Sequence, residues 1–202
     1  MQPTATRLPT EERQASIVMA ALQLAQTNSP GAITTTDLAQ ALGLSQGALF
    51  KHFASKEAIW LAAMRWVTGQ LLGTLHAAAE AAPDPVEALE RVFLAHVEFV
   101  VANPGVPRVI FHELQQGIDS PVKQQVRSLM QGYRQLLVRL LTEATQSGAV
   151  SKQLDIPAAA TLFMGIVQGL VMQSMLNGQV VAMRTDAPRV FHLYLCGIRT
   201  ST

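Results

Sequence analysis

The sequence is poor in cysteine and in charge. Cys196 is the single cysteine among 202 residues, which excludes an intrachain disulfide and fits a reducing compartment such as the cytoplasm. Charged residues make up only 14% of the chain, and their formal sum is +1. Since 49% of the residues are hydrophobic, the low charge indicates a packed globular protein and argues against a disordered one.

Motifs of the common catalytic classes are also missing. His112 and Glu113 are followed by Leu-Gln-Gln, so the HExxH pattern of zinc peptidases is not completed. The sequence contains neither a GxSxG nucleophile elbow nor a glycine-rich phosphate loop. His96 and Glu98 are two residues apart, a spacing that does not bring side chains together on one helix face. We therefore expect no enzymatic activity, no metal site and no cofactor.

One long segment, residues 156–183, has no charge at all. Its 28 residues are enough to span a bilayer, and Gly165 and Gly169 form a GxxxG pattern. Two mid-segment glutamines and a break at Asn177-Gly178 favour a different interpretation, a helix buried between its own domain and a partner. The first residues lack the apolar core of a signal peptide, and we expect residues 1–9 to be a disordered tail. We predict a cytoplasmic protein that does not enter the membrane.

Capping residues and helix breakers divide the chain into about nine helices. Asp84-Pro85, Ser120-Pro121, Asp155-Ile156-Pro157 and Asp186-Ala187-Pro188 each combine a capping side chain with a proline suited to a first helical turn. No alternating strand pattern of useful length is present. We predict an all-α protein with helices over residues 10–27, 34–42, 46–53, 55–81, 84–103, 107–116, 120–147, 155–178 and 186–199.

Residues 34–53, TTTDLAQALGLSQGALFKHF, have the pattern of a helix-turn-helix. Thr34 and Asp37 have the spacing of a capping box at the start of the first helix. Gly43 suits the turn because glycine adopts positive φ without a Cβ clash. Ser45 can then cap the second helix. Two helices joined in this way can place the second in the major groove of DNA.

The residue types on the outer face of this second helix distinguish a DNA-binding unit from an ordinary corner between two helices. Residues 43–56 contain no acid, whereas a face exposed only to water commonly carries charges of both signs. Leu49 and Phe53 are four residues apart and are expected to point inward. The outward positions are small or hydrogen-bonding, namely Ser45, Gln46, Ala48, Lys51 and His52. We interpret this face as DNA-facing, with modest nonspecific affinity because the overall charge is small.

The same stretch resembles the operator-binding domain of the TetR family of bacterial transcriptional repressors. The matching residues are Leu38-Ala39, Gly43-Leu44-Ser45, Phe50, His52-Phe53 and Ser55-Lys56-Glu57. Phe50 stands where the family usually has a tyrosine, so the hydroxyl that would contact a phosphate is absent. The resemblance implies a helix-turn-helix DNA-binding domain over residues 1–54 and an effector-binding and dimerisation domain over residues 55–202, linked by the helix at 55–81.

Roles at the DNA follow from the residue types together with this resemblance. We expect Gln46 and Lys51 to contact base edges or nearby phosphates. Gly47 and Ala48 are expected to permit close approach, and the Phe50 ring to pack against the DNA backbone. Contacts with the phosphate backbone set the register of the protein on DNA without reading its sequence. The residues expected to make them are Thr34, Thr36, Ser45, His52 and Lys56.

The resemblance further implies a small-molecule effector site inside the second domain. Its scarce charges and its methionines suggest an apolar or aromatic ligand, although Met and Phe at helical spacing also fit an ordinary packed core. The candidate lining residues are Trp66, Phe93, His96, Phe99, Val100, Phe111, His112, Met130, Tyr133, Leu137, Met164, Gln168 and Met172.

A two-fold dimer is expected because a lone recognition helix reads few base pairs. We place its interface on the segments 155–178 and 188–199, with contacts from Leu162, Gly165, Ile166, Gly169, Phe191, Tyr194 and Leu195. The sequence thus predicts a repressor that binds double-stranded DNA at a palindromic operator as a homodimer and is released by an effector. The alternative is a helix-turn-helix protein controlled by a protein partner, or one without any inducer.

Overall fold

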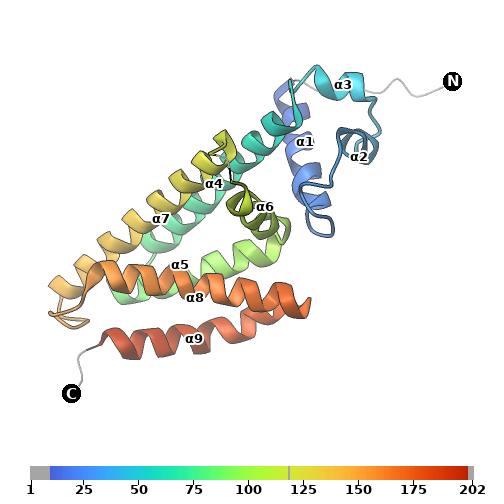
Figure 1. Cartoon of the computed structure of the whole chain (residues 1–202). Helices are drawn as coiled ribbons and strands as arrows, with labels where there is room; N and C mark the ends of the chain where they lie inside the picture. Colours follow the sequence, from blue (N-terminus) through green and yellow to red (C-terminus); the bar gives the residue numbers. More distant parts are fainter. Residues whose placement is uncertain (1–9, 118, 200–202) are drawn as a thin grey trace. The chain divides into compact units, whose positions relative to one another are not determined.

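A computed structural model describes residues 10–117 and 119–199, and this part of the chain is built of helices without strands (Figure 1). The expected tail at residues 1–9 lies outside it. The prediction of an all-α fold is confirmed. The elements are α1 (Thr10–Leu24), α2 (Thr35–Ala41), α3 (Gln46–Phe50), α4 (Lys56–Glu80), α5 (Pro85–Ala102), α6 (Gly105–Gln115), α7 (Pro121–Gln146), α8 (Ile156–Asn177), η1 (Val180–Ala182, a 3-10 helix) and α9 (Met183–Ile198).

The chain forms two compact units that do not coincide with simple halves of the sequence. Unit 1 consists of Met1–Val67 and Gly105–Gln125, and unit 2 of Thr68–Pro104 and Val126–Thr202. The long helix α4 is therefore divided between them, and α6 belongs with the N-terminal helices. The boundary predicted between residues 54 and 55 is a functional one, between DNA-binding helices and the rest of the chain. It is therefore not the same division as these compact units, and it stays a prediction.

Unit 1 is held together by a small apolar core and by a close contact between two helix backbones. Ile17 of α1, Leu38 of α2 and Leu49 of α3 are fully buried. Helix α6 packs against α1 at Gly105, where an added Cβ would lie 2.1 Å from the carbonyl oxygen of Leu22. Only glycine permits this approach, so residue 105 fixes how closely α6 lies against α1.

Most helix termini have the capping groups that the sequence indicates. The Asp84 carboxylate accepts hydrogen bonds of 2.9 Å from the backbone N–H groups of Val86 and Glu87. Asp155 accepts one of 3.0 Å from Ala158. At the other end of α8, Gly178 is left-handed with φ of 67°. These groups satisfy backbone atoms that a helix end leaves unpaired.

The start predicted for the last helix is wrong. Helix α9 begins at Met183 and not at residue 186, so Pro188 lies inside it. Packing outweighs the proline, because Met183 is buried and Arg184 forms three hydrogen bonds of 2.7–3.0 Å with Glu98 of α5. Pro188 is only the sixth residue of the helix, and its missing N–H costs one bond near the end.

The core of unit 2 is a continuous cluster of aromatic rings. It contains one ring from each of α5, α7 and α8 and two from α9, and none is more than 3% exposed: Phe93, Tyr133, Phe163, Phe191 and Tyr194. Ring centroids lie 5.3–6.3 Å apart, mostly in edge-to-face geometry, which aromatic quadrupoles favour. These rings fill the region where the four helices meet.

His96 adds a titratable group to the edge of this cluster. Its Nδ1 lies 3.1 Å from the Tyr133 hydroxyl oxygen, and the two rings meet edge-to-face. Burial lowers the pKa of His96 to about 4 and raises the pKa of Tyr133, with a further contribution from Tyr194. Both groups are therefore neutral at pH 7, joined by a hydrogen bond inside the unit.

We expect this histidine to make the protein less stable in mild acid. Its pKa is about 4 in the folded state and 6.5 in the unfolded state, so the unfolded chain binds a proton first as the pH falls. From pH 7 to pH 5 the free energy of unfolding should decrease by up to about 2 kcal/mol through this group, and it should level off below pH 4. Urea denaturation at both pH values measures the decrease.

The variant His96→Gln should lack this part of the pH dependence. His192→Gln is the matched control, because His192 is exposed on α9, and it should behave as the unmodified protein does. An equal loss of stability between pH 7 and 5 in all three proteins would contradict the assignment to His96.

Candidate nucleic-acid interface

The entry to α2 is a capping box. The Thr34 hydroxyl accepts a hydrogen bond of 3.1 Å from the Asp37 N–H, and the Asp37 carboxylate accepts bonds of 2.8 Å from the Thr34 N–H and hydroxyl. Hydrogen bonds from the Thr34 backbone and side chain keep the pKa of Asp37 below its usual value. The charged carboxylate fixes the first turn of α2.

A tight turn then directs the chain into α3. Gly43 has φ of 63°, and the Leu44 N–H donates to the Ala39 carbonyl at 2.8 Å. Ser45 caps α3 by accepting a bond of 3.1 Å from the Ala48 N–H. Helix α3 ends at Phe50, three residues before the predicted end at residue 53, although the chain keeps turning.

The outer side of α3 is largely open to solvent. Leu49 is fully buried and Phe50 is 46% exposed, while Ala48 and His52 are half-buried. At Gly47 an added Cβ would meet nothing closer than 4.0 Å, so packing within the protein does not require glycine there. The exposed members of the predicted DNA contacts on and beside this helix are Ser45, Gln46, Gly47, Phe50 and Lys51.

Two threonines of α2 hold the side chain of Gln46. Its amide nitrogen donates to the hydroxyl oxygens of Thr36 at 2.5 Å and Thr35 at 3.2 Å. Thr36 is among the residues predicted to contact the DNA phosphate backbone, but Thr35 was not singled out from the sequence. The run of three threonines at residues 34–36 was the available signal, because it places three hydroxyl groups at the start of α2.

Two of the residues predicted to contact phosphates have hydrogen-bond partners within the protein. Lys56 is half-buried, and its ammonium donates to the Gly31 carbonyl at 2.9 Å. Burial lowers the pKa of Lys56, an effect that Asp37 opposes. The Thr34 hydroxyl is likewise occupied on both sides by its capping box. Both side chains support the fold around α2, and their predicted contacts with DNA phosphates stay predictions.

The backbone of His52 is held by a residue of α1. Its carbonyl accepts a hydrogen bond of 3.0 Å from the Gln14 amide. Its Nδ1 is buried, with no hydrogen-bond partner within the described ranges 10–117 and 119–199. Nε2 is thus the ring nitrogen left for the predicted phosphate contact, which stays a prediction.

The predicted effector residues fall in both units. Trp66, Phe111 and His112 belong to unit 1, where the His112 ring packs against Gly31. In unit 2, Phe93, Phe99, Val100, Tyr133 and Leu137 are buried, and His96, Met130 and Met164 are half-buried. Gln168 and Met172 require correction, because both are exposed on the outer face of α8 and do not line the interior of the unit.

The predicted dimer residues also separate into two groups. Leu162, Gly165 and Gly169 are exposed on α8, and Ile166 is half-buried. Phe191, Tyr194 and Leu195 require correction, since they pack into the core of their own unit. Three further apolar residues are exposed, Leu176, Val181 and Leu193, at 72%, 58% and 70%. Leu176 and Leu193 lie within the segments predicted for the interface but were not among its named contacts, and Val181 lies between those segments.

Helix α8 is long and apolar enough to cross a membrane, with mean hydropathy of 1.5 and 28% of that stretch buried. Length and composition alone are weak evidence, because a helix covered by a partner has the same properties. The expected absence from membranes stays a prediction. Across the described residues, no group of three or more His, Cys, Asp or Glu side chains is placed to hold a metal ion.

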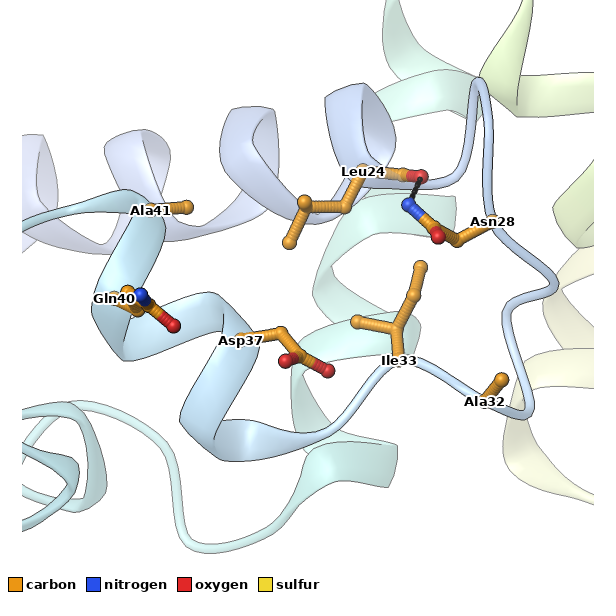
Figure 2. Close-up of a pocket in the computed structure, with 7 residues that line it drawn as sticks. All are labelled: Leu24, Asn28, Ala32, Ile33, Asp37, Gln40 and Ala41. Atoms are coloured by element: carbon orange, nitrogen blue, oxygen red, sulfur yellow. Dashed lines mark hydrogen bonds between the residues drawn. The ribbon is translucent and has the colours of Figure 1, made fainter.

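Unit 1 also has a surface pocket of about 370 Å³ beside α2 (Figure 2). Its walls come from the end of α1, the following loop and α2, and it is lined by Leu24, Asn28, Ala32, Ile33, Asp37, Gln40 and Ala41. The Asn28 amide donates to the Leu24 carbonyl at 3.0 Å, and Asp37 is bound within its capping box. No residue of α3 contributes to the pocket, so it is separate from the candidate DNA contacts.

Curated relatives and solved structures resemble the chain over most of its length. Nucleoid occlusion factor SlmA of Shewanella amazonensis is 26% identical over 161 residues, 80% of this chain and 82% of the relative. FadR of Bacillus halodurans has a TM-score of 0.81 at 21% identity, covering 98% of this chain and 100% of the other. FadR of Bacillus subtilis, solved in complex with stearoyl-CoA, has a TM-score of 0.78 at 23% identity, covering 92% and 99%.

Two family models match adjoining parts of the sequence. Residues 17–63 match bacterial regulatory proteins of the tetR family, the region that contains α2, the turn and α3. Residues 65–197 match the C-terminal region of YsiA-like proteins, well over half of the chain. The chain therefore belongs to the TetR family of bacterial transcription regulators, whose N-terminal part is a DNA-binding helix-turn-helix.

Proposed function

We propose that this chain is a cytoplasmic transcriptional repressor that binds a palindromic operator as a homodimer. The observation that carries the proposal is the outer face of α3, which is exposed, free of acidic residues and presented by capped helices. A helix with this surface can enter the major groove, and a second copy related by two-fold symmetry would read the next half-site about 34 Å away.

Exposed apolar residues on α8 and α9 support the dimer. Leu162 and Leu176 of α8 and Leu193 of α9 are each more than half exposed, and the two helices pack against each other. Gly165 and Gly169 have no heavy atom within 4 Å of an added Cβ, which leaves room for a partner helix to approach. Burial of such a surface contributes about 25 cal/mol per Å².

We expect Leu193→Arg to produce a monomer with weakened operator binding, because it places a charge in the proposed interface. Light scattering coupled to gel filtration measures the mass. Fluorescence anisotropy on a duplex selected from a random library measures DNA affinity, which should fall at least tenfold. Leu114→Arg is the control, since Leu114 is likewise an exposed leucine, at 51%, but lies on α6. A monomeric unmodified protein at micromolar concentration would contradict the dimer.

The two lysines near α3 should behave differently. Lys51→Ala removes an exposed positive charge next to α3 and should reduce the slope of log affinity against log salt by about one per protomer. Lys56→Ala removes the hydrogen bond to Gly31 and should mainly lower the free energy of unfolding, by about 1 kcal/mol. Anisotropy titrations at several salt concentrations and urea denaturation separate the two effects. Identical salt slopes in both variants would contradict this assignment.

We further propose that a small apolar or aromatic molecule releases the repressor from its operator. Unit 2 supports this, because its interior is largely apolar and includes a hydrogen-bonded polar pair, His96 and Tyr133. The similar fold of Bacillus subtilis FadR, in complex with stearoyl-CoA, makes long acyl chains the first ligand class to test. A ligand that binds this interior would bring apolar groups to the aromatic cluster and a polar group to the pair.

An effector should raise the melting temperature, since binding to the native state stabilises by mass action, and should release DNA over the same concentration range. Scanning fluorimetry with saturated acyl-CoAs of increasing length and with aromatic acids measures the first effect, and anisotropy measures the second. Tyr133→Phe should weaken both together. Stabilisation without release would argue against induction by that compound.

Control by a protein partner is the second candidate. It is favoured by the sequence similarity to SlmA, a nucleoid occlusion factor, whose name describes a role other than response to a metabolite. Operator binding that no small molecule alters would support this alternative.

A further inference from the structure

We propose that Gln46 reads the operator through its amide oxygen alone, and therefore recognises an amino group on a base edge, N6 of adenine or N4 of cytosine. This inference rests on the proposed function and specifies what one residue of α3 detects. It differs from the two-bond contact that a free glutamine makes with adenine, in which the side chain donates to N7 and accepts from N6.

The amide nitrogen of Gln46 is already occupied. A glutamine amide has two N–H donors, and the two recorded bonds go to the hydroxyl oxygens of Thr36 and Thr35 at 2.5 and 3.2 Å. Donation to N7 of adenine would require breaking one of them. The arrangement thus removes the donor half of the usual glutamine contact.

The amide oxygen is the part of the side chain that remains available. Gln46 is exposed, and across residues 10–117 and 119–199 its oxygen has no recorded hydrogen-bond partner. A carbonyl oxygen only accepts hydrogen bonds. In the major groove the donors are N6 of adenine and N4 of cytosine, so these are the groups that Gln46 can bind.

Local structure holds the three side chains in place before DNA arrives. Thr35 and Thr36 are the first two residues of α2, whose start is fixed by the Thr34 capping box. Gln46 is the first residue of α3, whose start is fixed by Ser45. Immobilising a glutamine side chain in advance reduces the entropy lost on binding. Thr35 and Thr36 therefore act as positioning residues for the base contact.

Base analogues test the inference on a duplex selected from a random library. The base pair read by Gln46 is identified as the position of the duplex at which the Gln46→Ala variant no longer prefers one base over the others. There, an analogue without the amino group, such as purine deoxyriboside for adenine or 2-pyrimidinone for cytosine, should weaken binding about five- to tenfold, as expected for one hydrogen bond. A 7-deazapurine at that pair, which lacks N7, should change binding less than twofold.

The threonines provide a second test with a readout that a purely structural role would not change. In the double variant Thr35→Val and Thr36→Val the amide nitrogen is released, so binding should become sensitive to the 7-deazapurine. Gln40→Ala, an exposed glutamine of α2, is the matched control and should keep the unmodified pattern. Circular dichroism checks that the double variant is folded.

The outcomes separate the inference from the proposed function. If no duplex is selected above background, the proposed function fails. If a duplex is selected but N7 removal weakens binding while amino-group removal does not, the inference alone is overturned. A preference unchanged in Gln46→Ala, or a double variant with the unmodified analogue pattern, also overturns it.

Discussion

The proposed DNA contacts depend on the hydrogen bonds that start α2 and α3. A helix of five residues such as α3 is too short to be stable by itself, so its direction comes from its surroundings. The Thr34–Asp37 box and the Ser45 cap fix both helix starts, and Leu49 anchors α3 in the core. With these positions set, Gln46, Gly47 and Phe50 of α3 stay exposed, as the proposed recognition of DNA requires.

Unit 2 combines an aromatic core with an apolar outer surface, and the two features have different consequences. The interlocked rings around Phe163 make the interior sensitive to any molecule that enters it, because displaced rings lose specific edge-to-face contacts. The outer face of α8 exposes Leu162 and Leu176, and the proposed dimer would cover them. The proposed regulation uses both features, because a ligand inside unit 2 would have to change the spacing of two recognition helices.

Caps and turns could be predicted from sequence because they depend on a few neighbouring residues. Asp84, Asp155 and Gly178 behave as their chemistry indicates. The orientation of α8 could not be predicted, because a helix that is apolar all round gives no inward stripe. The expectation that Gln168 lines the interior is wrong for this reason, since Gln168 is exposed. The start of α9 was misjudged for a related reason, since the proline signal is local and the Arg184–Glu98 pairing joins residues 86 apart.

Gly105 has a mechanical meaning beyond its role in packing. Where side chains separate two helices, rotamer changes can absorb a small shift of one helix before the other moves. At Gly105 the backbones of α6 and α1 touch directly, so this compliance is absent. A displacement of α6 toward α1 would therefore press one backbone directly on the other, with no side chain between them to rearrange.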